Sequence, residues 1–292
     1  MKLTRQQVAE FFIEKLILLC GVISILFVVL IFVFLLKEGL SLFSTVKVTD
    51  FLFGKAWYPV SEPSKFGILS LIMGSLWVTF GAIIISVPIG IASAIYIAEI
   101  AHPKVREILK AGIEMLAAIP SVVIGFIGIT TLVPLVRNVF HLSTGLTVLS
   151  GSIMLAFMAV PTIVSVTEDA FYSIPKRYKE AALALGATHW QTIWRVLIRA
   201  AFPGIVAACM LGIGRVIGET IAVLMVTGNV AKIPHSFADP ARTLTATIAA
   251  EMGEAVRGSD HYFSLFAIGI VLFIITFLIN LISDIYLNRE IK

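Results

Sequence analysis

The sequence predicts an all-α integral membrane protein with about six transmembrane helices, on three observations. Of the 292 residues, 59% are hydrophobic and 14% are charged, with a mean hydropathy of +1.00, whereas soluble domains average roughly 45–50% apolar and about 25% charged residues. The apolar residues gather in runs of the roughly 20 residues that a helix needs to cross a bilayer. The runs do not alternate apolar and polar residues, which argues against the strands of a membrane barrel.

The expected helices follow one another along the chain. A short segment, 1–15, precedes a first span at 16–36, and a five-helix core fills 69–287. The first span is too long for the apolar part of a cleaved signal peptide and lacks a small-residue cleavage pattern, so we expect it to remain in the protein. The spans of the core are expected at about 69–98, 112–136, 146–166, 204–226 and 263–287.

Lysine and arginine residues set the expected orientation. When the N-terminus is placed inside the cell, the inner segments hold more of them than the outer segments, as the positive-inside rule requires. Both termini and the loop 168–203 are then cytoplasmic, and Trp57 and Tyr58 fall in an outer segment, where aromatic side chains suit the lipid headgroup region. The net charge of +4 follows from this loop placement, so we expect no binding to nucleic acid.

The cytoplasmic loop at about 173–203 carries two amphipathic runs. In the first run, Tyr178, Ala181 and Ala182 recur at helical spacing beside basic side chains, and Gly186 follows. Such a helix lies on the lipid surface in one interpretation and docks a soluble partner in the other. We use Gly186 to separate them, because a tight groove would need a residue without a side chain there and a lipid surface would not.

The same loop resembles the EAA signature of ABC importer permeases. The resemblance rests on Glu180-Ala181-Ala182, then Gly186, then Val196-Leu197-Ile198, although Arg199 stands where the family has a proline. It implies a short coupling helix that sits in a groove of a cytoplasmic ATPase, with Glu180, Ala181, Ala182 and Gly186 as the coupling residues. The chain lacks a Walker A phosphate loop. ATP with Mg²⁺ would therefore be bound by a partner ATPase, and no cofactor is expected in this chain.

Arg215 and Glu219 are charged residues inside the predicted fifth span. A charged side chain at the centre of a span costs about 2.5–3.5 kcal/mol on insertion scales, and a spacing of four residues places both on one helical face. Gly212, Gly214 and Gly218 make a strip beside them that allows close helix approach. The two charges form either a structural ion pair or a polar passage for an anion.

The passage interpretation assigns Arg215, Glu219 and the adjoining Thr220 to the substrate pathway. The planar fork of Arg215 suits a phosphate-like oxyanion because it makes two parallel hydrogen bonds. Glu219 would orient Arg215, or would accept a hydrogen bond from a protonated phosphate oxygen. Hydrogen phosphate carries such a proton near neutral pH and sulfate does not.

Other polar residues near the spans are weaker signals. Pro120-Ser121 would open a half-helix whose positive end faces the pathway. Glu168-Asp169 is interpreted as a solvated helix end, and Thr162, like the other hydroxyls inside spans, is expected to pack or to bond to its own helix.

The outer-loop charges include Arg242, Glu251 and Glu254. They either dock a soluble substrate carrier or are simply hydrated. The histidines lack metal-ligand spacing, and the sequence holds no recognisable catalytic set of side chains, which argues against an integral membrane enzyme.

Several stretches together resemble the PstC family, one of the two permease subunits of the bacterial high-affinity phosphate importer. The resemblance covers about 10–290 and rests on Phe66-Gly67-Ile68-Leu69, the run 118–126, the motifs around Arg215 and Glu219, Arg242-Thr243-Leu244-Thr245, and His261-Tyr262. It implies the type I, MetI-like permease fold, a place in the bacterial inner membrane, and half of a pathway for inorganic phosphate. The alternatives are the sister permease subunit, a permease for molybdate or sulfate, and a phosphate-signalling membrane scaffold.

The resemblance also implies a set of partners at the lipid bilayer. These are a PstA-like second permease subunit, a homodimeric ABC ATPase, a periplasmic or lipid-anchored phosphate-binding protein, and a PhoU-like regulator. Transport would proceed by alternating access, because ATP binding closes the ATPase dimer and moves the coupling helices. The chain itself would be a non-catalytic transport subunit.

Overall fold

The protein is described by a computed structural model that covers residues 5–290, apart from the side chains of 5–9, 12, 283–284 and 286–290. Long helices dominate it. They are α1 (Arg5–Ser41), α3 (Leu69–Ile95), α4 (Pro103–Ala118), α7 (Val148–Tyr172), α10 (Ile198–Gly218) and α13 (Asp260–Glu290).

Shorter elements connect the long helices. The short α-helices are α2 (Val48–Phe53), α5 (Ser121–Ile127), α6 (Val133–Val139), α8 (Arg177–Ala184), α9 (His189–Thr192), α11 (Ile221–Val226) and α12 (Leu244–Glu251). A 3₁₀ turn, η1 (Leu42–Ser44), follows α1, and the π-helical turns are η2 (Tyr96–Ile100), η3 (Gly128–Leu132) and η4 (Ile193–Leu197). Strands β1 (Trp57–Tyr58) and β2 (Lys65–Phe66) form an antiparallel hairpin in which Trp57 pairs with Phe66.

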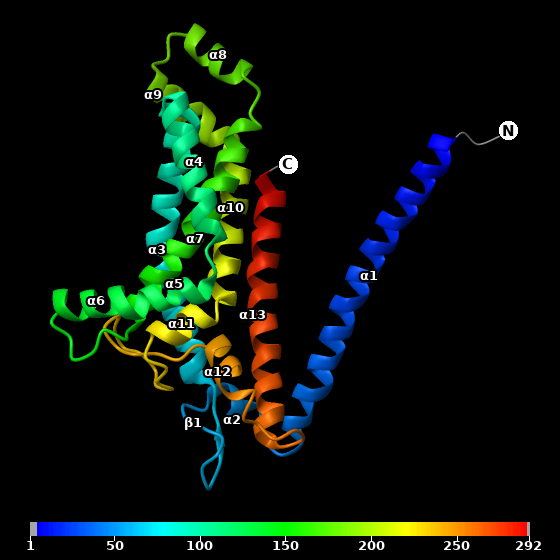
Figure 1. Ribbon diagram of the computed structural model, residues 1–292, viewed down its shortest axis with the longest axis vertical. Helices are drawn as coiled ribbons and strands as arrows, with labels where there is room; N and C mark the ends of the chain where they lie inside the picture. Colours follow the sequence, from blue (N-terminus) through cyan, green and yellow to red (C-terminus); the bar gives the residue numbers. More distant parts are fainter. Residues whose placement is uncertain (1–4, 291–292) are drawn as a thin grey trace.

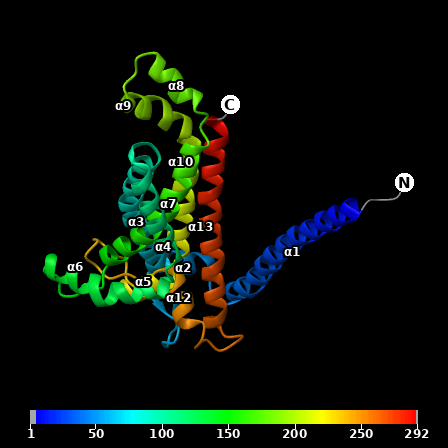
Figure 2. The ribbon, with the colours of Figure 1, turned by 45° about the horizontal axis from the view of Figure 1, so that its top comes forward.

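Helices α3, α7 and α10 run side by side and form the centre of the bundle (Figure 1). Helix α4 packs on α7, and α13 packs on α10. Helix α1 leans away from the bundle in both ribbon views and meets α13 only toward its own C-terminal end (Figures 1 and 2), where Phe32 and Phe34 contact Phe273 and Phe266. Most apolar side chains of α1 are therefore exposed.

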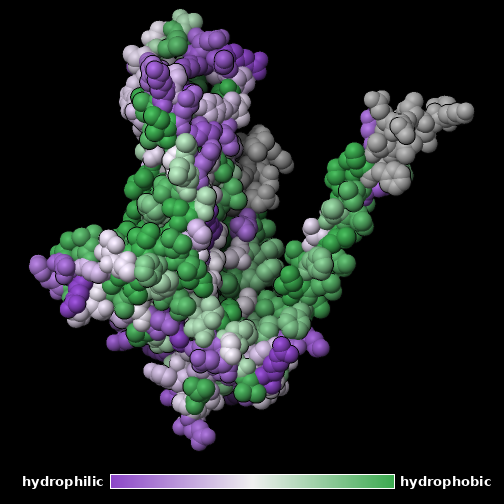
Figure 3. All heavy atoms as spheres, viewed as in Figure 1, coloured by the Kyte–Doolittle hydropathy of each residue, from purple (hydrophilic) through white to green (hydrophobic). Residues whose placement is uncertain are grey.

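The part of the chain that the structure describes holds 6 helical segments long and apolar enough to cross a membrane. Apolar side chains cover the middle of the visible face, and polar side chains gather at its two ends, around α8 and around the β-hairpin (Figure 3). The start of α1 and the end of α13 both point toward the end of the molecule that carries α8 (Figure 1). The prediction of an all-helical membrane protein with about six spans is confirmed.

The first span agrees with the prediction but has no boundary at residue 16. Residues 5–15 and the predicted span 16–36 belong to one helix, α1, and residues 1–4 lie outside the described part. The candidate spans Leu69–Ile100, Val148–Tyr172 and Asp260–Ile282 match the predicted second, fourth and sixth spans within a few residues.

The predicted third span, 112–136, is not one helix. Helix α4 ends at Ala118, Ile119 takes an extended backbone with ψ 126°, and α5 begins at Ser121 after Pro120. The cause is local, because proline disfavours a helical conformation in the preceding residue and suits the start of a new helix. The segment α5–η3–α6 then runs across the long helices in both ribbon views (Figures 1 and 2).

The predicted fifth span, 204–226, is wrong at both ends. The apolar helical segment begins as early as His189, because Pro203-Gly204 lies inside α10 rather than at its start, and it ends at Gly218. Glu219 has an extended backbone with φ −69° and ψ 134°, and α11 starts after Thr220. The chain therefore changes direction between Arg215 and Thr220.

The centre of the bundle is packed around Ile163 of α7, whose exposed fraction is 1%. A Cβ atom on Gly90 of α3 would lie 2.6 Å from Ile163 Cγ2, and one on Gly212 of α10 would lie 2.7 Å from Ile163 Cγ1. Ile163 thus fills the space between two glycines on different helices. Small residues allow such close helix approach in membranes.

We expect Gly212→Ala to destabilise the protein. The added methyl group would overlap Ile163, which cannot retreat because Gly90 closes its other side, and overpacking of this kind costs about 1–3 kcal/mol. The measurement is the thermal unfolding midpoint of the purified protein in detergent. Gly214→Ala is the matched control, because a Cβ there meets no described atom within 4 Å. Equal midpoints for the two variants would show that the α7–α10 packing is not tight.

Candidate functional site

The lower part of α10 presents two different faces. Gly212 packs on Ile163 of α7, whereas Leu211, Gly214 and Gly218 are exposed. At 3.6 residues per turn, Leu211, Gly214 and Gly218 share one side of the helix, and Arg215 lies between that side and the face of Gly212. We call Leu211, Gly214 and Gly218 the open face of α10. The glycine strip that the sequence suggested is therefore divided, since only Gly212 packs within this chain.

Arg215 is partly buried and bonds to α7. Its Nη1 donates a hydrogen bond to Thr162 Oγ1 at 3.2 Å. Among the described residues no carboxylate lies within ion-pair distance of Arg215, and Glu219 is not its partner. The structural ion pair proposed from the sequence is wrong, because α10 ends at Gly218 before a fourth residue can return to the same face.

The carboxylate of Glu219 turns toward the start of α11. Glu219 Oε1 accepts hydrogen bonds from the backbone N–H groups of Thr220 at 3.0 Å and Ala222 at 3.3 Å. Negative charge is favourable beside the free N–H groups at a helix N-terminus. Thr220 donates its hydroxyl to Gly218 O at 3.2 Å. The three predicted pathway residues are therefore neighbours in space, but Glu219 and Thr220 stabilise the break rather than pair with Arg215.

A small polar cavity lies beside this break. The hydroxyl-bearing residues Ser75, Thr79, Thr243 and Thr245 line it together with Glu219. Its volume of about 10 Å³ suits roughly one water molecule. Thr245 Oγ1 also donates to Glu219 O at 2.8 Å, so the start of α12 is fastened directly to the break.

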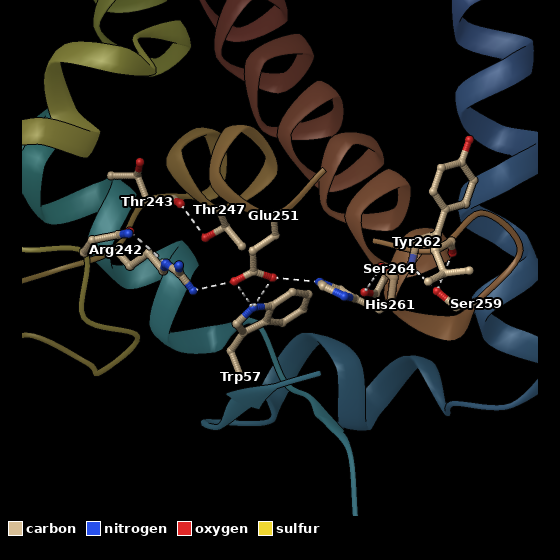
Figure 4. A network of polar contacts seen from close by, with 11 residues as sticks. Trp57, Arg242, Thr243, Thr247, Glu251, Ser259, His261, Tyr262 and Ser264 are labelled. Carbon is tan, nitrogen blue, oxygen red and sulfur yellow. Dashed lines mark hydrogen bonds and ion pairs between the residues drawn. The ribbon is translucent and has the colours of Figure 1, made fainter. Parts of the chain in front are cut away.

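A network of polar side chains, which we call the Glu251 network, lies at the end of the bundle opposite α8 (Figures 1 and 4). Glu251 accepts hydrogen bonds from Arg242 Nη1 at 2.6 Å, from Trp57 Nε1 at 3.1 Å, and pairs with His261 Nε2 at 2.9 Å. Arg242 Nε donates to Asn229 Oδ1 at 2.8 Å. One carboxylate thus joins the β-hairpin, the loop before α12, and the start of α13.

This network corrects two expectations. Arg242 and Glu251 are not simply hydrated, since their side chains are only 16% and 15% exposed and bond to each other. Trp57 is not at a lipid-facing surface, because it is 2% exposed and donates to Glu251, although Tyr58 is exposed. Trp57 lies 194 positions from Glu251 in the sequence, so no local pattern could have indicated that contact.

The Glu251 network forms one wall of an open cavity of about 1190 Å³. Lys55, Lys232, His235 and Glu254 also line this cavity. Among the described residues, Lys55 and Lys232 make no ion pair. The wall of the cavity therefore carries two lysines without an ion-pair partner among the described residues, at the end of the bundle opposite α8 (Figure 1).

The loop between α11 and α12 has a defined fold that the sequence did not predict. Val148 N and Leu149 N, at the start of α7, donate to the carbonyl oxygens of Asp239 and Phe237. The backbone N–H groups of His235 and Ser236 donate to Asp239 Oδ2 and hold the pKa of that carboxyl below its usual range. The loop thereby caps α7.

The loop between α7 and α10 folds as two short helices, α8 and α9, joined by a tight turn. Gly186 takes φ +84°, Gly186 N donates to Leu183 O, and Ala187 N donates to Ala182 O. These two bonds define a Schellman motif, which ends a helix with a left-handed residue. Thr188 and Gln191 then form a capping box at the start of α9.

The turn gives a reason for glycine at position 186 that does not involve a binding partner. No described atom lies within 4 Å of a Cβ built on it, and its backbone conformation alone requires glycine. A helix on a lipid surface would need this glycine as much as a helix in a groove, so Gly186 does not separate the two interpretations. The expectation that only a tight groove would require glycine at this position is therefore wrong.

The coupling residues of α8 differ in exposure. Glu180 and Ala181 are exposed, whereas Ala182 is buried against the rest of the loop. Lys179 Nζ bonds to Glu99 Oε2 at 2.6 Å, which ties α8 to η2, the turn that follows α3. Large apolar side chains nevertheless face outward from the loop, among them Leu185, Trp190 and Trp194.

Glu168 is not a solvated helix end. Its exposed fraction is 2%, and its carboxylate lies 3.4 Å from Lys110 Nζ of α4, whereas the neighbouring Asp169 is exposed as expected. The crossing of α4 over α7 covers Glu168, and the sequence did not indicate that crossing.

Comparison with known proteins agrees with this geometry. Residues 86–291 match the family described as binding-protein-dependent transport system inner membrane component. The probable ABC transporter permease protein YqgH of Bacillus subtilis (strain 168) is 42% identical and is aligned over 94% of this chain and 89% of that protein. The phosphate transport system permease protein PstC of Mesorhizobium japonicum (strain LMG 29417 / CECT 9101 / MAFF 303099) is 39% identical, over 82% and 78%.

A solved structure gives the same fold. The inward-facing MetNI methionine ABC transporter has a TM-score of 0.57 at 22% identity, and the match covers 76% of this chain and 94% of that chain. The class is therefore that of ABC importer permeases with the type I, MetI-like fold, as predicted. The chain belongs to the family of binding-protein-dependent transport system inner membrane components.

We expect Gly186→Ala to loosen the α8–α9 turn. The left-handed conformation costs an L-residue about 1–2 kcal/mol, so the loop should open about tenfold more often and be cleaved faster by trypsin. Gly186→Asn is the control, because asparagine tolerates this conformation. The measurement is the rate of cleavage after the exposed Lys176 and Arg177. Equal rates for wild type and Gly186→Ala would contradict the turn.

We expect Glu219→Ala to destabilise the break between α10 and α11, since it removes the acceptor of two backbone N–H groups. Loss of a helix cap costs about 0.5–2 kcal/mol. Glu219→Gln keeps an acceptor oxygen and should retain most of the stability. Thermal unfolding in detergent compares the two variants. If both variants lose stability equally, the negative charge and not the hydrogen bonding holds the break.

Proposed function

We propose that this chain is a transmembrane permease subunit of an ATP-driven importer of inorganic phosphate and forms half of its translocation pathway. The observation that carries the proposal is Arg215, a cation that has no carboxylate partner among the described residues and lies beside the open face of α10. An unpaired cation in a span is costly, and an anion that binds there offsets the cost. The similarity to phosphate permeases of the PstC type supports phosphate as that anion.

The pathway residues take distinct roles in this proposal. Arg215 contacts the oxyanion with its planar fork. Glu219 Oε1 holds the helix break, while Glu219 Oε2, which accepts no hydrogen bond from the described residues, is free to accept one from a protonated phosphate oxygen. Thr220 fixes the turn between the two through Gly218.

A PstA-like second permease subunit would complete the pathway. The open face of α10, with Leu211, Gly214 and Gly218, has no partner within the described part of the chain. Exposed glycines on a span allow a second helix to approach closely. Arg215 would then lie at the seam between the two subunits, where an anion can pass.

The cytoplasmic loop would dock a homodimeric ABC ATPase. Glu180 and Ala181 are exposed on α8, and Leu185, Trp190 and Trp194 present apolar surface near it. The ATPase would bind ATP with Mg²⁺ and drive alternating access, and this chain would supply no catalytic group. A PhoU-like regulator belongs to the proposed assembly on the family resemblance alone.

The opposite end of the bundle would receive a periplasmic or lipid-anchored phosphate-binding protein. The cavity of about 1190 Å³ at that end is lined by Lys55 and Lys232, which make no ion pair among the described residues. In this arrangement the chain lies in the bacterial inner membrane with both termini and α8 in the cytoplasm. The alternative permeases, for sulfate or molybdate, would use the same geometry with another oxyanion.

Arg215→Gln should reduce phosphate uptake at least about tenfold while the complex still assembles. The reason is the loss of hydrogen bonds from a charged donor, which are worth about 1.5–3 kcal/mol. Arg215→Lys keeps the charge but not the fork, and should retain an intermediate rate. The measurement is uptake of labelled phosphate by the reconstituted complex.

The same assay separates the alternatives. Stronger competition by sulfate or molybdate than by unlabelled phosphate would reassign the substrate. A wild-type complex that assembles and hydrolyses ATP but moves no oxyanion would favour the signalling scaffold. Unimpaired uptake by Arg215→Gln would refute the role of Arg215.

A further inference from the structure

Thr162 is the side chain that meets the Arg215 guanidinium. Thr162 lies in α7, one residue before Ile163, and its Oγ1 accepts the hydrogen bond from Arg215 Nη1 at 3.2 Å. Arginine has five N–H donors. Within the described residues, this is the one hydrogen bond that a side chain accepts from Arg215, so the other donors remain available to a ligand.

Thr162 differs from Thr130 and Thr276, two other threonines in the apolar helices. Thr130 donates its hydroxyl to Phe126 O at 2.8 Å, and Thr276 donates to Leu272 O at 3.0 Å. This bonding to the preceding turn is the usual way in which a helical threonine satisfies its hydroxyl. Thr162 makes no such bond to its own helix within the described structure, contrary to the expectation from the sequence. Its hydroxyl is used between helices.

The place of Thr162 relative to α10 is fixed by packing. Ile163 fills the space between Gly90 and Gly212, so α7 cannot slide or rotate against α10 at this level without overlap. Thr162 adjoins Ile163, and Arg215 is three residues beyond Gly212, close to one turn further along α10. The packing contact and the polar contact therefore belong to one rigid junction.

We infer that Thr162 is a positioning residue that holds the Arg215 guanidinium at the edge of the open face of α10, where the oxyanion passes. This inference rests on the proposed function. A long, flexible arginine side chain would otherwise sample several rotamers, and a donor that is held in place before the ligand arrives binds or passes it faster. Thr162 itself need not touch the anion.

The test replaces the hydroxyl without changing the shape of the side chain. Thr162→Val should lower the maximal rate of phosphate uptake by reconstituted complex about tenfold. The concentration of loaded binding protein that gives half-maximal uptake should stay unchanged, because docking takes place at the outer end. Thr162→Ser, which keeps the hydroxyl, should restore most of the rate. Thr276→Val is the matched control, since the Thr276 hydroxyl bonds only within α13.

Each outcome decides the inference. Wild-type uptake by Thr162→Val, or failure of Thr162→Ser to restore the rate, would overturn it, as would an equal loss in Thr276→Val. If the complex with Thr162→Val does not assemble, the test uses Thr162→Ala, which removes the same hydroxyl and leaves a smaller side chain. Arg215→Gln separates a failure of the proposed function from a failure of the positioning role. Unimpaired uptake by Arg215→Gln refutes the proposed function. If Arg215→Gln abolishes uptake and Thr162→Val leaves it unchanged, only the positioning role is refuted.

Discussion

The close approach of three helices around Ile163 determines the rest of this structure. Because Gly90 and Gly212 leave room for no further atom, the rotation of α10 about its own axis is set by α7. That rotation turns Gly214 and Gly218 away from the bundle and brings Arg215 to the border between the packed and the unpacked side. A packing constraint between apolar groups thus decides where Arg215 lies on this helix.

The break after Gly218 follows a second constraint, that of backbone groups in an apolar medium. Non-helical backbone at membrane depth is tolerated only when its polar groups find partners in the protein or in water. Here Glu219 Oε1 accepts from two backbone N–H groups and Thr245 donates to the Glu219 carbonyl. The acidic residue that the sequence offered as a counter-ion for Arg215 serves the backbone instead. Among the described residues, Thr162 is the one side chain that accepts a hydrogen bond from Arg215, and a hydroxyl does not neutralise the guanidinium charge.

The sequence predicted the parts of this fold that depend on one stretch of chain. Apolar runs located the spans, and Pro120 marked a helix start that the structure confirms. The end of α10 at Gly218 was missed, because an apolar run resumes at Ile221, directly after Glu219 and Thr220, and was read as the same helix. The burial of Glu168 and Trp57 was not predicted for another reason. Glu168 is covered by α4 and Trp57 by α12, and both elements are distant in the sequence. The periodicity of one helix does not indicate such neighbours. The pathway residues were identified, but their mutual geometry was not.

The carboxylate of Glu251 has a consequence for how the protein is made. Trp57, which bonds to it, is 194 positions earlier in the chain, and His261 comes from the start of the last helix. During synthesis the β-hairpin is therefore made long before Glu251 has been translated. Four candidate spans separate the hairpin from Glu251 in the sequence. The network around Glu251 therefore becomes complete only when the chain has been made as far as His261, at the start of α13.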